Sequence, residues 1–365
     1  MNATPDMNAA SCKPVLIMAG GTGGHIFPGL AVAEALSRRD VPVVWLGSQA
    51  GMENRLVPER GIALETLAIG GLRGKGLATK LKMPLRLGKA IWQALRIVKR
   101  LQPRAVLSFG GYAAGPGGLA AWLRRRPLLV HEQNRAPGLT NRVLAKLATR
   151  VLCGFPDAFA NGEWIGNPVR AEIAAVEPPE ARLGGRDGAL RLLVLGGSQG
   201  ARALNEALPD VIAGLQNSCD IEVRHQCGRD NVDLTMAGYM RHSLSVSPEP
   251  FIDDMVAAYR WADLVVCRAG ALTLAELAAV GLPSILVPLP IAADDHQTRN
   301  AKFLVERGAA LLVPQGDRFR ERLGDAVASL ADHREKLLAM AQAARAMAKT
   351  DAAERVADAV LKEAA

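Results

Sequence analysis

Short apolar runs that lead into glycine loops are the clearest pattern along the chain. The first is residues 14–19 (PVLIMA), which enters the loop 20–24 (GGTGG) and is followed by a helical stretch at 29–38. A short run without polar alternation is typical of a strand that is buried on both faces of a parallel sheet. The pattern therefore predicts a buried strand, a tight glycine turn and a helix.

The same arrangement occurs again in the second half of the chain. Residues 190–195 (LRLLVL) lead into the glycine loop 196–200 (GGSQG), which starts 176 residues after the first loop, and a helical stretch follows at 201–215. One such unit near the start of each half indicates a duplicated α/β architecture. The length of 365 residues also suits two domains.

Further strands are expected between the helical stretches. The apolar runs that fit them are residues 42–46, 105–109, 127–131, 151–153, 264–267 and 284–288. Strands that alternate with helices predict right-handed βαβ crossovers and parallel sheets. Between the two halves, Glu177–Asp187 (EPPEARLGGRD) is rich in proline, glycine and charge, so we place the domain boundary there.

The composition is that of a folded protein with a mainly aliphatic core, since hydrophobic residues make up 49%, charged residues 22% and aromatic residues only 4%. No CxxC pair is present, which predicts buried free thiols in a reducing compartment. The cysteines are Cys12, Cys153, Cys219, Cys227 and Cys267. The sequence contains no secretory signal pattern and no apolar stretch near the ~20 residues that span a bilayer. We therefore expect a cytoplasmic or peripheral protein.

Three glycine loops at predicted strand ends are candidate phosphate sites: residues 20–24, 110–118 and 196–200. Glycines let the backbone approach a phosphate closely, and a following helix presents free N–H groups. The first loop lacks the third glycine of a dinucleotide-binding fingerprint, because Ile26 stands there. The P-loop pattern is also missing. The sequence therefore argues against a nicotinamide dehydrogenase and a P-loop NTPase.

Polar side chains gather at the same strand ends and helix starts. His25 directly follows the first glycine loop, and residues 131–134 (HEQN) follow an apolar strand. Arg170 can pair with a diphosphate, and Glu276, one turn into a predicted helix, can accept hydrogen bonds from ribose hydroxyls. Gln297 can bind sugar hydroxyls through its amide. Because no D-x-D triplet is present, we expect helix N-termini and arginine, and no fixed metal, to neutralise a leaving diphosphate.

The net charge of +8 is concentrated in one segment. Residues 73–104 contain ten Lys or Arg residues and no Asp or Glu, interleaved with large apolar side chains. That mixture suits an anionic bilayer surface, and the alternative is a solvated, partly buried helix pair. RNA binding is not favoured, because no aromatic stacking platform is present. The expected membrane patch comprises Leu77, Leu81, Leu85, Ile91, Trp92 and Trp122.

Nine motifs in order along the chain together resemble the MurG family, the N-acetylglucosaminyltransferases of peptidoglycan synthesis. They are GGTGGHIFPGLAVAEAL (20–36), GLRGKG (71–76), GGYAAGPGGLAAW (110–122), HEQN (131–134), GNPVR (166–170), GGSQGARALN (196–205), FIDDM (251–255), CRAGALTLAE (267–276) and HQTRNA (296–301). One motif alone would mean little, whereas nine in family order are specific.

The resemblance implies an α/β protein of the GT-B fold, with two Rossmann-like domains whose parallel sheets face a deep interdomain cleft. It implies an N-terminal acceptor and membrane-side domain at residues 12–172 and a C-terminal UDP-GlcNAc-binding domain at residues 188–344. A C-terminal helix, at about residues 345–365, is expected to pack back on the N-terminal domain.

The resemblance also implies the reaction of a hexosyltransferase. N-acetylglucosamine moves with inversion from UDP-GlcNAc to the C4 hydroxyl of lipid-linked diphospho-N-acetylmuramoyl-pentapeptide, which converts lipid I to lipid II, and no cofactor is implied. The residues expected to hold UDP-GlcNAc by match to the family are Thr22, Gly23, Gly24, Asn134, Arg170, Ser198, Ile252, Ala271, Leu272, Thr273, Leu274, Ala275, Glu276 and Gln297.

Two candidates remain for the base that takes the acceptor proton, His25 and Glu132. The expected partners are UDP-GlcNAc, undecaprenyl-diphospho-muramoylpentapeptide, an anionic membrane surface and other cell-wall synthesis proteins, but not nucleic acid. The expected location is peripheral, on the cytoplasmic face of the inner membrane. Two alternatives share the fold and the nucleotide site: another GT-B enzyme, such as a UDP-sugar glycosyltransferase or a UDP-GlcNAc 2-epimerase, and a non-catalytic UDP-GlcNAc sensor.

Overall fold

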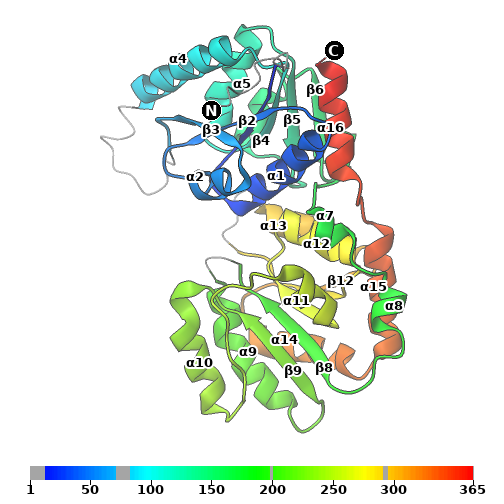
Figure 1. Ribbon diagram of the computed structural model, residues 1–365. Coiled ribbons are helices and arrows are strands. Elements are labelled where there is room, and N and C mark those ends of the chain that lie inside the picture. The colour runs from blue at the N-terminus through cyan, green and yellow to red at the C-terminus, as the bar shows by residue number, and fades with distance from the viewer. Residues whose placement is uncertain (1–12, 71–82, 198–199, 291–294, 365) are drawn as a thin grey trace, which may run out of the picture. The chain divides into compact units, whose positions relative to one another are not determined.

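The computed structural model describes residues 13–70, 83–197, 200–290 and 295–364 (Figure 1). These residues fold into two compact units. Unit 1 comprises Met1–Pro168 together with Asp351–Ala365, and unit 2 comprises Val169–Thr350. Each unit is an α/β fold with its own sheet and its own core.

In the described part of unit 1, seven parallel strands form one sheet in the order β3-β2-β1-β4-β5-β6-β7. The strands are β1 (Val15–Ala19), β2 (Val43–Ser48), β3 (Ala63–Leu67), β4 (Ala105–Gly110), β5 (Leu128–Glu132), β6 (Arg150–Cys153) and β7 (Glu163–Trp164). The chain builds outward from β1 in one direction and then restarts at β4 in the other. Ligands of open α/β sheets bind at such a switch point, outside the carboxyl ends of the strands.

Helices cover both faces of this sheet. They are α1 (Gly23–Ser37), α2 (Glu53–Leu56), η1 (Pro58–Arg60), α4 (Met83–Leu101), α5 (Ala114–Leu123), α6 (Leu139–Leu144) and α16 (Ala352–Glu363). One core cluster joins the sheet to α1 and α16, and the other joins it to α4, α5 and the end of α6. The last helix therefore belongs to the same unit as the first.

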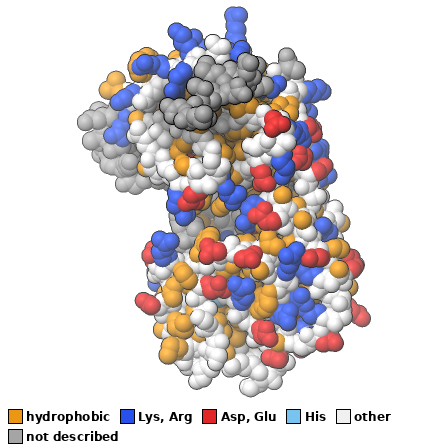
Figure 2. Space-filling view, viewed as in Figure 1, with side chains coloured by type: hydrophobic (Ala, Val, Ile, Leu, Met, Phe, Trp, Pro, Cys, Tyr) orange, Lys and Arg blue, Asp and Glu red, His pale blue; other side chains and the backbone are white. Residues whose placement is uncertain are grey.

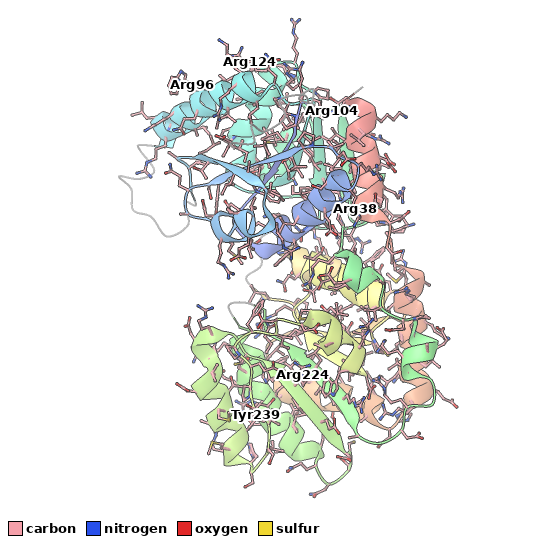
Figure 3. All side chains as sticks on the ribbon, in the orientation of Figure 1. Arg38, Arg96, Arg104, Arg124, Arg224 and Tyr239 are labelled. Atoms are coloured by element: carbon pink, nitrogen blue, oxygen red, sulfur yellow. The ribbon has the colours of Figure 1, made fainter. Side chains whose placement is uncertain are left out.

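Ion pairs hold α16 beside α1 (Figures 1 and 3). Arg38 and Arg39 lie at the end of α1, and both bind Glu354. Arg39 also binds Asp358. Apolar side chains of α16, including Val356 and Val360, are fully buried in the same core.

The described residues of unit 2 form a five-stranded parallel sheet in the order β12-β11-β10-β8-β9. The strands are β8 (Leu190–Leu195), β9 (Ile221–Gln226), β10 (Leu264–Cys267), β11 (Ser284–Leu286) and β12 (Ala310–Leu312). The helices are α7 (Ala171–Ala174), α8 (Pro179–Leu183), α9 (Arg202–Leu215), η2 (Arg229–Asn231), α10 (Val232–Arg241), α11 (Met255–Trp261), α12 (Ala271–Val280), α13 (His296–Val305), α14 (Phe319–Ala331) and α15 (Arg334–Ala346). The switch point here lies between β8 and β10.

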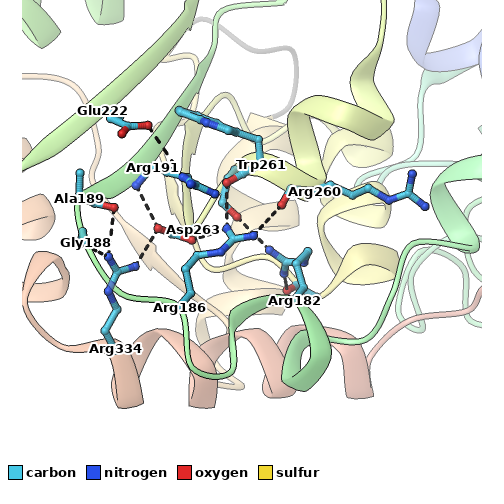
Figure 4. A network of polar contacts seen from close by, with 12 residues as sticks. Arg182, Arg186, Gly188, Ala189, Arg191, Glu222, Arg260, Trp261, Asp263 and Arg334 are labelled. Atoms are coloured by element: carbon cyan, nitrogen blue, oxygen red, sulfur yellow. Dashed lines mark hydrogen bonds and ion pairs between the residues drawn. The ribbon is translucent and has the colours of Figure 1, made fainter.

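The segment Glu177–Asp187, where the composition places the domain boundary, lies within unit 2 (Figure 4). Arg182 donates hydrogen bonds to the carbonyl oxygens of Ala262 at 2.9 Å and Gly281 at 2.6 Å. Arg186 lies 2.6 Å from the buried carboxylate of Asp263. These arginines fix the charged segment to unit 2, and the division between the units falls earlier in the sequence, after Pro168.

The strands expected from the apolar runs are confirmed, as are the helices after both glycine loops. Three of the cysteines, Cys153, Cys227 and Cys267, are buried free thiols, as expected. Cys219 is only partly buried, and Cys12 lies outside the described residues. No helix in the described ranges combines the length and the apolar character needed to cross a membrane.

Candidate functional site

The switch point of unit 1 brings two glycine loops together. Gly21, with a φ of +94°, turns the chain from β1 into α1, and Gly111, with a φ of +95°, turns it from β4 towards α5. A Cβ placed on Gly111 would lie 2.6 Å from the carbonyl oxygen of Gly20. Only glycine allows this approach, so the two loops form one backbone surface at the carboxyl ends of β1 and β4.

The start of α1 offers backbone N–H groups at this surface. Thr22 is the N-cap residue, with an extended backbone and no side-chain hydrogen bond to the helix, and Gly23 begins the helix. Thr22 and Gly24 are both exposed. An exposed helix start built from small residues is a suitable place for an anionic group.

His25 lies between the two loops. Its Nδ1 lies 3.2 Å from the carbonyl oxygen of Gly20, and because a carbonyl only accepts, Nδ1 donates. The neutral imidazole then carries its proton on Nδ1 and has its lone pair on Nε2. A Cβ on Gly110 would lie 3.6 Å from Nε2 and 3.5 Å from the amide nitrogen of Asn141. His25 and Asn141 therefore approach the same glycine.

Glu132 is held by several hydrogen bonds at the end of β5. Its Oε1 accepts hydrogen bonds from the backbone N–H of Asn134 at 2.9 Å and from the Asn134 amide at 3.2 Å. Its Oε2 accepts from the backbone N–H of Gly138 at 3.1 Å and from the Asn141 amide at 2.9 Å. The side chain is 2% exposed, so the carboxylate organises the loop between β5 and α6.

The other residues of the HEQN run are also bound inside unit 1. His131 Nε2 lies 2.9 Å from the carbonyl oxygen of Gly166, and burial lowers the pKa of His131 to about 4. Gln133 donates to the His131 carbonyl, and Asn167 donates to the Gln133 carbonyl. His131 and Gln133 are buried and connect β5 to the segment after β7.

In unit 2, the N-terminus of α12 lies at the carboxyl end of β10. Gly270 is the N-cap residue, and no side chain caps the first turn. Among the expected donor residues, the side chains of Ala271, Leu274 and Ile252 are buried in the protein. These residues can therefore contribute to a ligand site mainly through their backbone groups. The N–H groups at the start of α12 are suited to bind a diphosphate.

Glu276 lies in the second turn of α12 and is 8% exposed. Tyr259 on α11 donates its hydroxyl to Glu276 Oε2 at 2.8 Å, and Arg170 approaches Oε1 at 3.3 Å. Burial raises the pKa of Glu276, while the charge of Arg170 and the two hydrogen bonds oppose that effect. The structure thus brings Arg170 and Glu276, two of the expected donor residues, together within unit 2.

Of the remaining expected donor residues, the structure describes Gln297 but not Ser198. Gln297 lies in the first turn of α13, and its Oε1 accepts the backbone N–H of Leu289 at 2.9 Å, so this oxygen positions the chain after β11. Ser198 lies outside the described residues. Leu272, Thr273 and Ala275 are partly buried on α12. In unit 1, Thr22, Gly23 and Gly24 lie together, and Asn134 lies beside Glu132.

Sequence reasoning missed Asn141, Tyr259 and Glu53. Asn141 joins His131 and Glu132 to the Gly110 loop, Tyr259 holds Glu276, and Glu53 holds the first glycine loop. Glu53 binds Gly21, which lies 32 positions away in the sequence, and Tyr259 binds Glu276, which lies 17 positions away. A pattern of local spacing does not reveal such contacts.

The membrane patch expected from the sequence falls partly on α4 and α5. Leu85 is 79% exposed and Trp92 is 56% exposed on α4, and Trp122 on α5 is 48% exposed. Ile91 is partly buried, while Leu77 and Leu81 lie outside the described residues. Figure 2 shows Lys and Arg side chains with hydrophobic ones between them at the end of unit 1 that carries α4, and Figure 3 shows Arg96 and Arg124 there.

Apolar side chains are also exposed on α6, which packs beside α5. Leu139 is 70% exposed and Val143 is 54% exposed, one helical turn apart. Asn141 lies between them in sequence but is buried at 3% exposure. The short helix α6 therefore presents apolar side chains to solvent while Asn141 reaches Glu132 in the interior.

Comparison with known proteins identifies the class of the protein as a glycosyltransferase, which agrees with the two parallel α/β sheets and their switch points. Residues 15–153 match the glycosyltransferase family 28 N-terminal domain, and residues 191–356 match its C-terminal domain. The structure resembles the crystal structure of MurG from Acinetobacter baumannii, with a TM-score of 0.84 and 43% identity over 96% of this chain and 99% of that one. The fold is thus the GT-B fold of glycosyltransferases.

Two curated relatives are more similar in sequence. Both are named UDP-N-acetylglucosamine–N-acetylmuramyl-(pentapeptide) pyrophosphoryl-undecaprenol N-acetylglucosamine transferase. The relative from Xanthomonas campestris pv. campestris (strain 8004) is 58% identical over 99% of this chain and 84% of its own length. The relative from Xylella fastidiosa is 57% identical over 96% of this chain and 97% of its own length. The chain belongs to glycosyltransferase family 28 and, within it, to the MurG family.

Proposed function

We propose that the protein transfers N-acetylglucosamine from UDP-GlcNAc to the C4 hydroxyl of lipid-linked diphospho-N-acetylmuramoyl-pentapeptide, with inversion at the anomeric carbon. The reaction converts lipid I to lipid II in peptidoglycan synthesis. The observation that carries the proposal is the 57–58% identity, over nearly the whole chain, to relatives named for this transfer. The geometry of each unit supports it separately.

Unit 2 is the donor side of the proposal. The diphosphate of UDP-GlcNAc lies against the uncapped N-terminus of α12, where the backbone N–H groups and Arg170 offset its charge. Glu276 accepts hydrogen bonds from the ribose hydroxyls. The two carboxylate oxygens of Glu276 offer about four lone pairs that can accept hydrogen bonds. Tyr259 and Arg170 each use one of them. The residues that fix Glu276 therefore leave it able to bind a sugar.

Unit 1 supplies the base, and we assign that role to His25 rather than Glu132. Glu132 accepts hydrogen bonds on both oxygens from backbone and amide donors and is 2% exposed, so it is poorly placed to take a proton from a substrate. In His25, the Gly20 carbonyl holds the proton on Nδ1, which leaves the basic lone pair on Nε2.

The transfer is one displacement. His25 Nε2 takes the proton of the acceptor C4 hydroxyl as its oxygen forms a bond to the anomeric carbon. The bond between that carbon and the β-phosphate oxygen breaks, and UDP leaves with the electron pair. The N–H groups at the start of α12 and the guanidinium of Arg170 stabilise the negative charge that develops on UDP.

The acceptor is anchored in a bilayer by its lipid, so the enzyme works at the membrane surface. The exposed apolar side chains Leu85, Trp92 and Trp122, with the basic residues around them, support peripheral binding of unit 1 to anionic lipid. Each basic residue near such a surface contributes about 1 kcal/mol. We place the enzyme at the cytoplasmic face of the inner membrane, as the resemblance to the family implies.

The proposal is tested by incubating the purified protein with radiolabelled UDP-GlcNAc and a short-chain lipid-diphospho-muramoylpentapeptide. We expect label in the lipid product, and we expect the His25→Ala and Glu276→Ala variants to lose it. Binding of UDP-GlcNAc without transfer would overturn the acceptor assignment. It would favour a UDP-GlcNAc 2-epimerase or a non-catalytic sensor, and release of epimerised sugar would separate those two.

A further inference from the structure

A buried carboxylate lies beneath the first glycine loop of unit 1. Glu53, the first residue of α2, is fully buried. Its Oε1 accepts the backbone N–H and the hydroxyl of Ser48, both at 2.8 Å, and its Oε2 accepts the backbone N–H of Gly21 at 3.2 Å. Since a buried carboxylate is costly unless it is hydrogen-bonded, these contacts are the reason that it can occupy this position.

Glycines surround this carboxylate from three parts of the chain. A Cβ on Gly20 would lie 2.6 Å from Glu53 Oε1, one on Gly47 would lie 2.5 Å from Cγ, and one on Gly51 would lie 1.9 Å from Oε2. Real Cβ atoms do not come this close to a packed side chain. The ends of β1 and β2 and the turn before α2 are therefore shaped around Glu53.

The hydrogen bonds continue from Glu53 to His25 through the loop backbone. Glu53 holds the N–H of Gly21, whose φ of +94° sets the turn out of β1. The carbonyl of the preceding residue, Gly20, is the group that accepts the Nδ1 proton of His25. The backbone of Gly20 also packs against Gly111 of the second loop. A shift of the Gly20–Gly21 peptide would therefore move the acceptor that orients the imidazole.

We propose that Glu53 is a positioning residue for the transfer reaction. It fixes the first glycine loop so that the Gly20 carbonyl holds His25 with its proton on Nδ1 and its basic Nε2 beside Gly110. This inference rests on the proposed function, in which His25 is the base. A small displacement of a reacting group lowers a rate strongly, by about 100-fold for 1 Å, so a residue that never touches the substrate can control turnover.

The first test is Glu53→Gln. The amide has nearly the same shape as the carboxylate, but its NH₂ group must face either the Gly21 N–H or the Ser48 donors, and the loop has to move. We expect kcat to fall about 10–100-fold. We expect KM for UDP-GlcNAc to change less than about threefold, because the proposed donor contacts lie mainly in unit 2. Glu59→Gln, on the exposed helix η1, is the matched control and should leave both constants unchanged.

A double-mutant cycle with His25→Ala separates positioning from general support of the fold. If Glu53 acts through His25, Glu53→Gln has no further effect on the residual rate of the His25→Ala variant. If it lowers that residual rate by the same factor as in the wild type, the positioning role is overturned while the transfer function stands. Full activity of His25→Ala alone would instead overturn the base assignment.

A milder variant covers the case in which Glu53→Gln does not fold. Ser48→Ala removes one hydroxyl donor and keeps the backbone N–H of residue 48, so the carboxylate stays bound but less firmly. We expect a fall in kcat of about 3–10-fold that vanishes in the His25→Ala background. An equal fall in both backgrounds, or a wild-type rate with Ser48→Ala, would contradict the proposal.

Discussion

The amide of Asn141 donates to Glu132 Oε2 over 2.9 Å and at the same time lies beside Gly110, the glycine that His25 also approaches. One side chain from the short helix α6 thus joins the loop-organising carboxylate to the glycine loop that His25 also approaches. This arrangement supports the different roles that we propose for Glu132 and His25, although both are polar residues at strand ends in the sequence.

The two roles predict opposite effects of two substitutions. Glu132→Gln places an NH₂ group among N–H donors, so it should cost about 1–3 kcal/mol of unfolding free energy. Its kcat should fall less than about 10-fold. His25→Ala should leave the unfolding midpoint unchanged and lower kcat by about 10²–10⁴-fold. Urea unfolding and the transfer assay on the same preparations check both. A stable but inactive Glu132→Gln protein beside an active His25→Ala protein would make Glu132 the base.

The hydroxyl of Tyr259 predicts an effect on donor binding. Tyr259→Phe removes one of the two groups that fix Glu276, so the dissociation constant of UDP should rise about 3–10-fold, at a stability cost of about 1–2 kcal/mol. Tyr239→Phe is the matched control, because its buried hydroxyl binds His225 and not Glu276. It should lose similar stability with UDP affinity unchanged, as measured by calorimetry. Equal UDP affinities for the two variants would contradict the role of Tyr259.

The buried imidazole of His131 predicts acid sensitivity. Burial lowers its pKa to about 4 in the folded protein, against about 6.5 in the unfolded chain. The folded state therefore binds fewer protons between these values, and the free energy of unfolding should fall as pH drops from about 6.5 towards 4. The full loss is on the order of 3 kcal/mol. Burial of His225, whose pKa is about 3, adds to the same trend.

The measurement is urea unfolding at a series of pH values, with His131→Gln as the comparison. The variant should be less stable at neutral pH, because it loses the imidazole bond to Gly166, and its stability should depend less on pH. A pH dependence identical to that of the wild type would show that His131 is not the group responsible.

The fold was predictable because its sheets are parallel and buried, so β1, β4 and β8 appear as short apolar runs before glycine, and β10 appears as a short apolar run. Strand β9 (IEVRHQ) was not predicted from the sequence, because it contains Arg224 and His225 and is not a continuous apolar run. Its histidine is buried, with one nitrogen 2.9 Å from the Tyr239 hydroxyl and the other 3.0 Å from the Asn205 side-chain oxygen. A polar residue satisfied by two distant partners cannot be distinguished in sequence from a solvated one.

The candidate site was predictable where its residues lie at positions that local spacing in the sequence marks. The glycine loops, His25, Arg170 and Glu276 lie at strand ends and helix starts, where local spacing gives a signal. Glu53 gives no such signal, since its partners come from the ends of two other elements. The sequence therefore did not reveal the side chains that hold the first glycine loop and Glu276 in place.

The buried carboxylate of Asp263 predicts a large loss of stability in unit 2 (Figure 4). It is fully buried and lies 2.6 Å from Arg186 and 2.7 Å from Arg334, and it also accepts the backbone N–H of Arg191. Asp263→Asn leaves two guanidinium groups without their carboxylate, so unfolding should become easier by about 3–5 kcal/mol. Glu222→Gln is the control, because this exposed residue lies 3.9 Å from Arg191 and should change stability by less than about 0.5 kcal/mol.

The exposed apolar face of α4 predicts where the protein meets lipid. The double variant Leu85→Glu, Trp92→Glu removes two large exposed apolar side chains and adds two negative charges beside basic residues. Binding to anionic phosphatidylglycerol vesicles should weaken at least about 10-fold, since each buried side chain of this size contributes about 1.5–3 kcal/mol. Leu234→Glu on α10 of unit 2, where the leucine is 51% exposed, is the matched control and should bind as the wild type does.

Turnover assays with two kinds of acceptor distinguish an effect of the α4 substitutions on membrane binding from an effect on the catalytic residues. With an acceptor embedded in vesicles, the α4 double variant should be slower than the wild type in proportion to its weaker binding. With a water-soluble short-chain acceptor, the two should be equally fast, because none of the proposed catalytic or donor residues lies on α4. Added salt should weaken vesicle binding of the wild type, since exposed charges are screened. Unchanged vesicle binding of the double variant would mean that α4 is a solvated helix and that the lipid contact lies elsewhere.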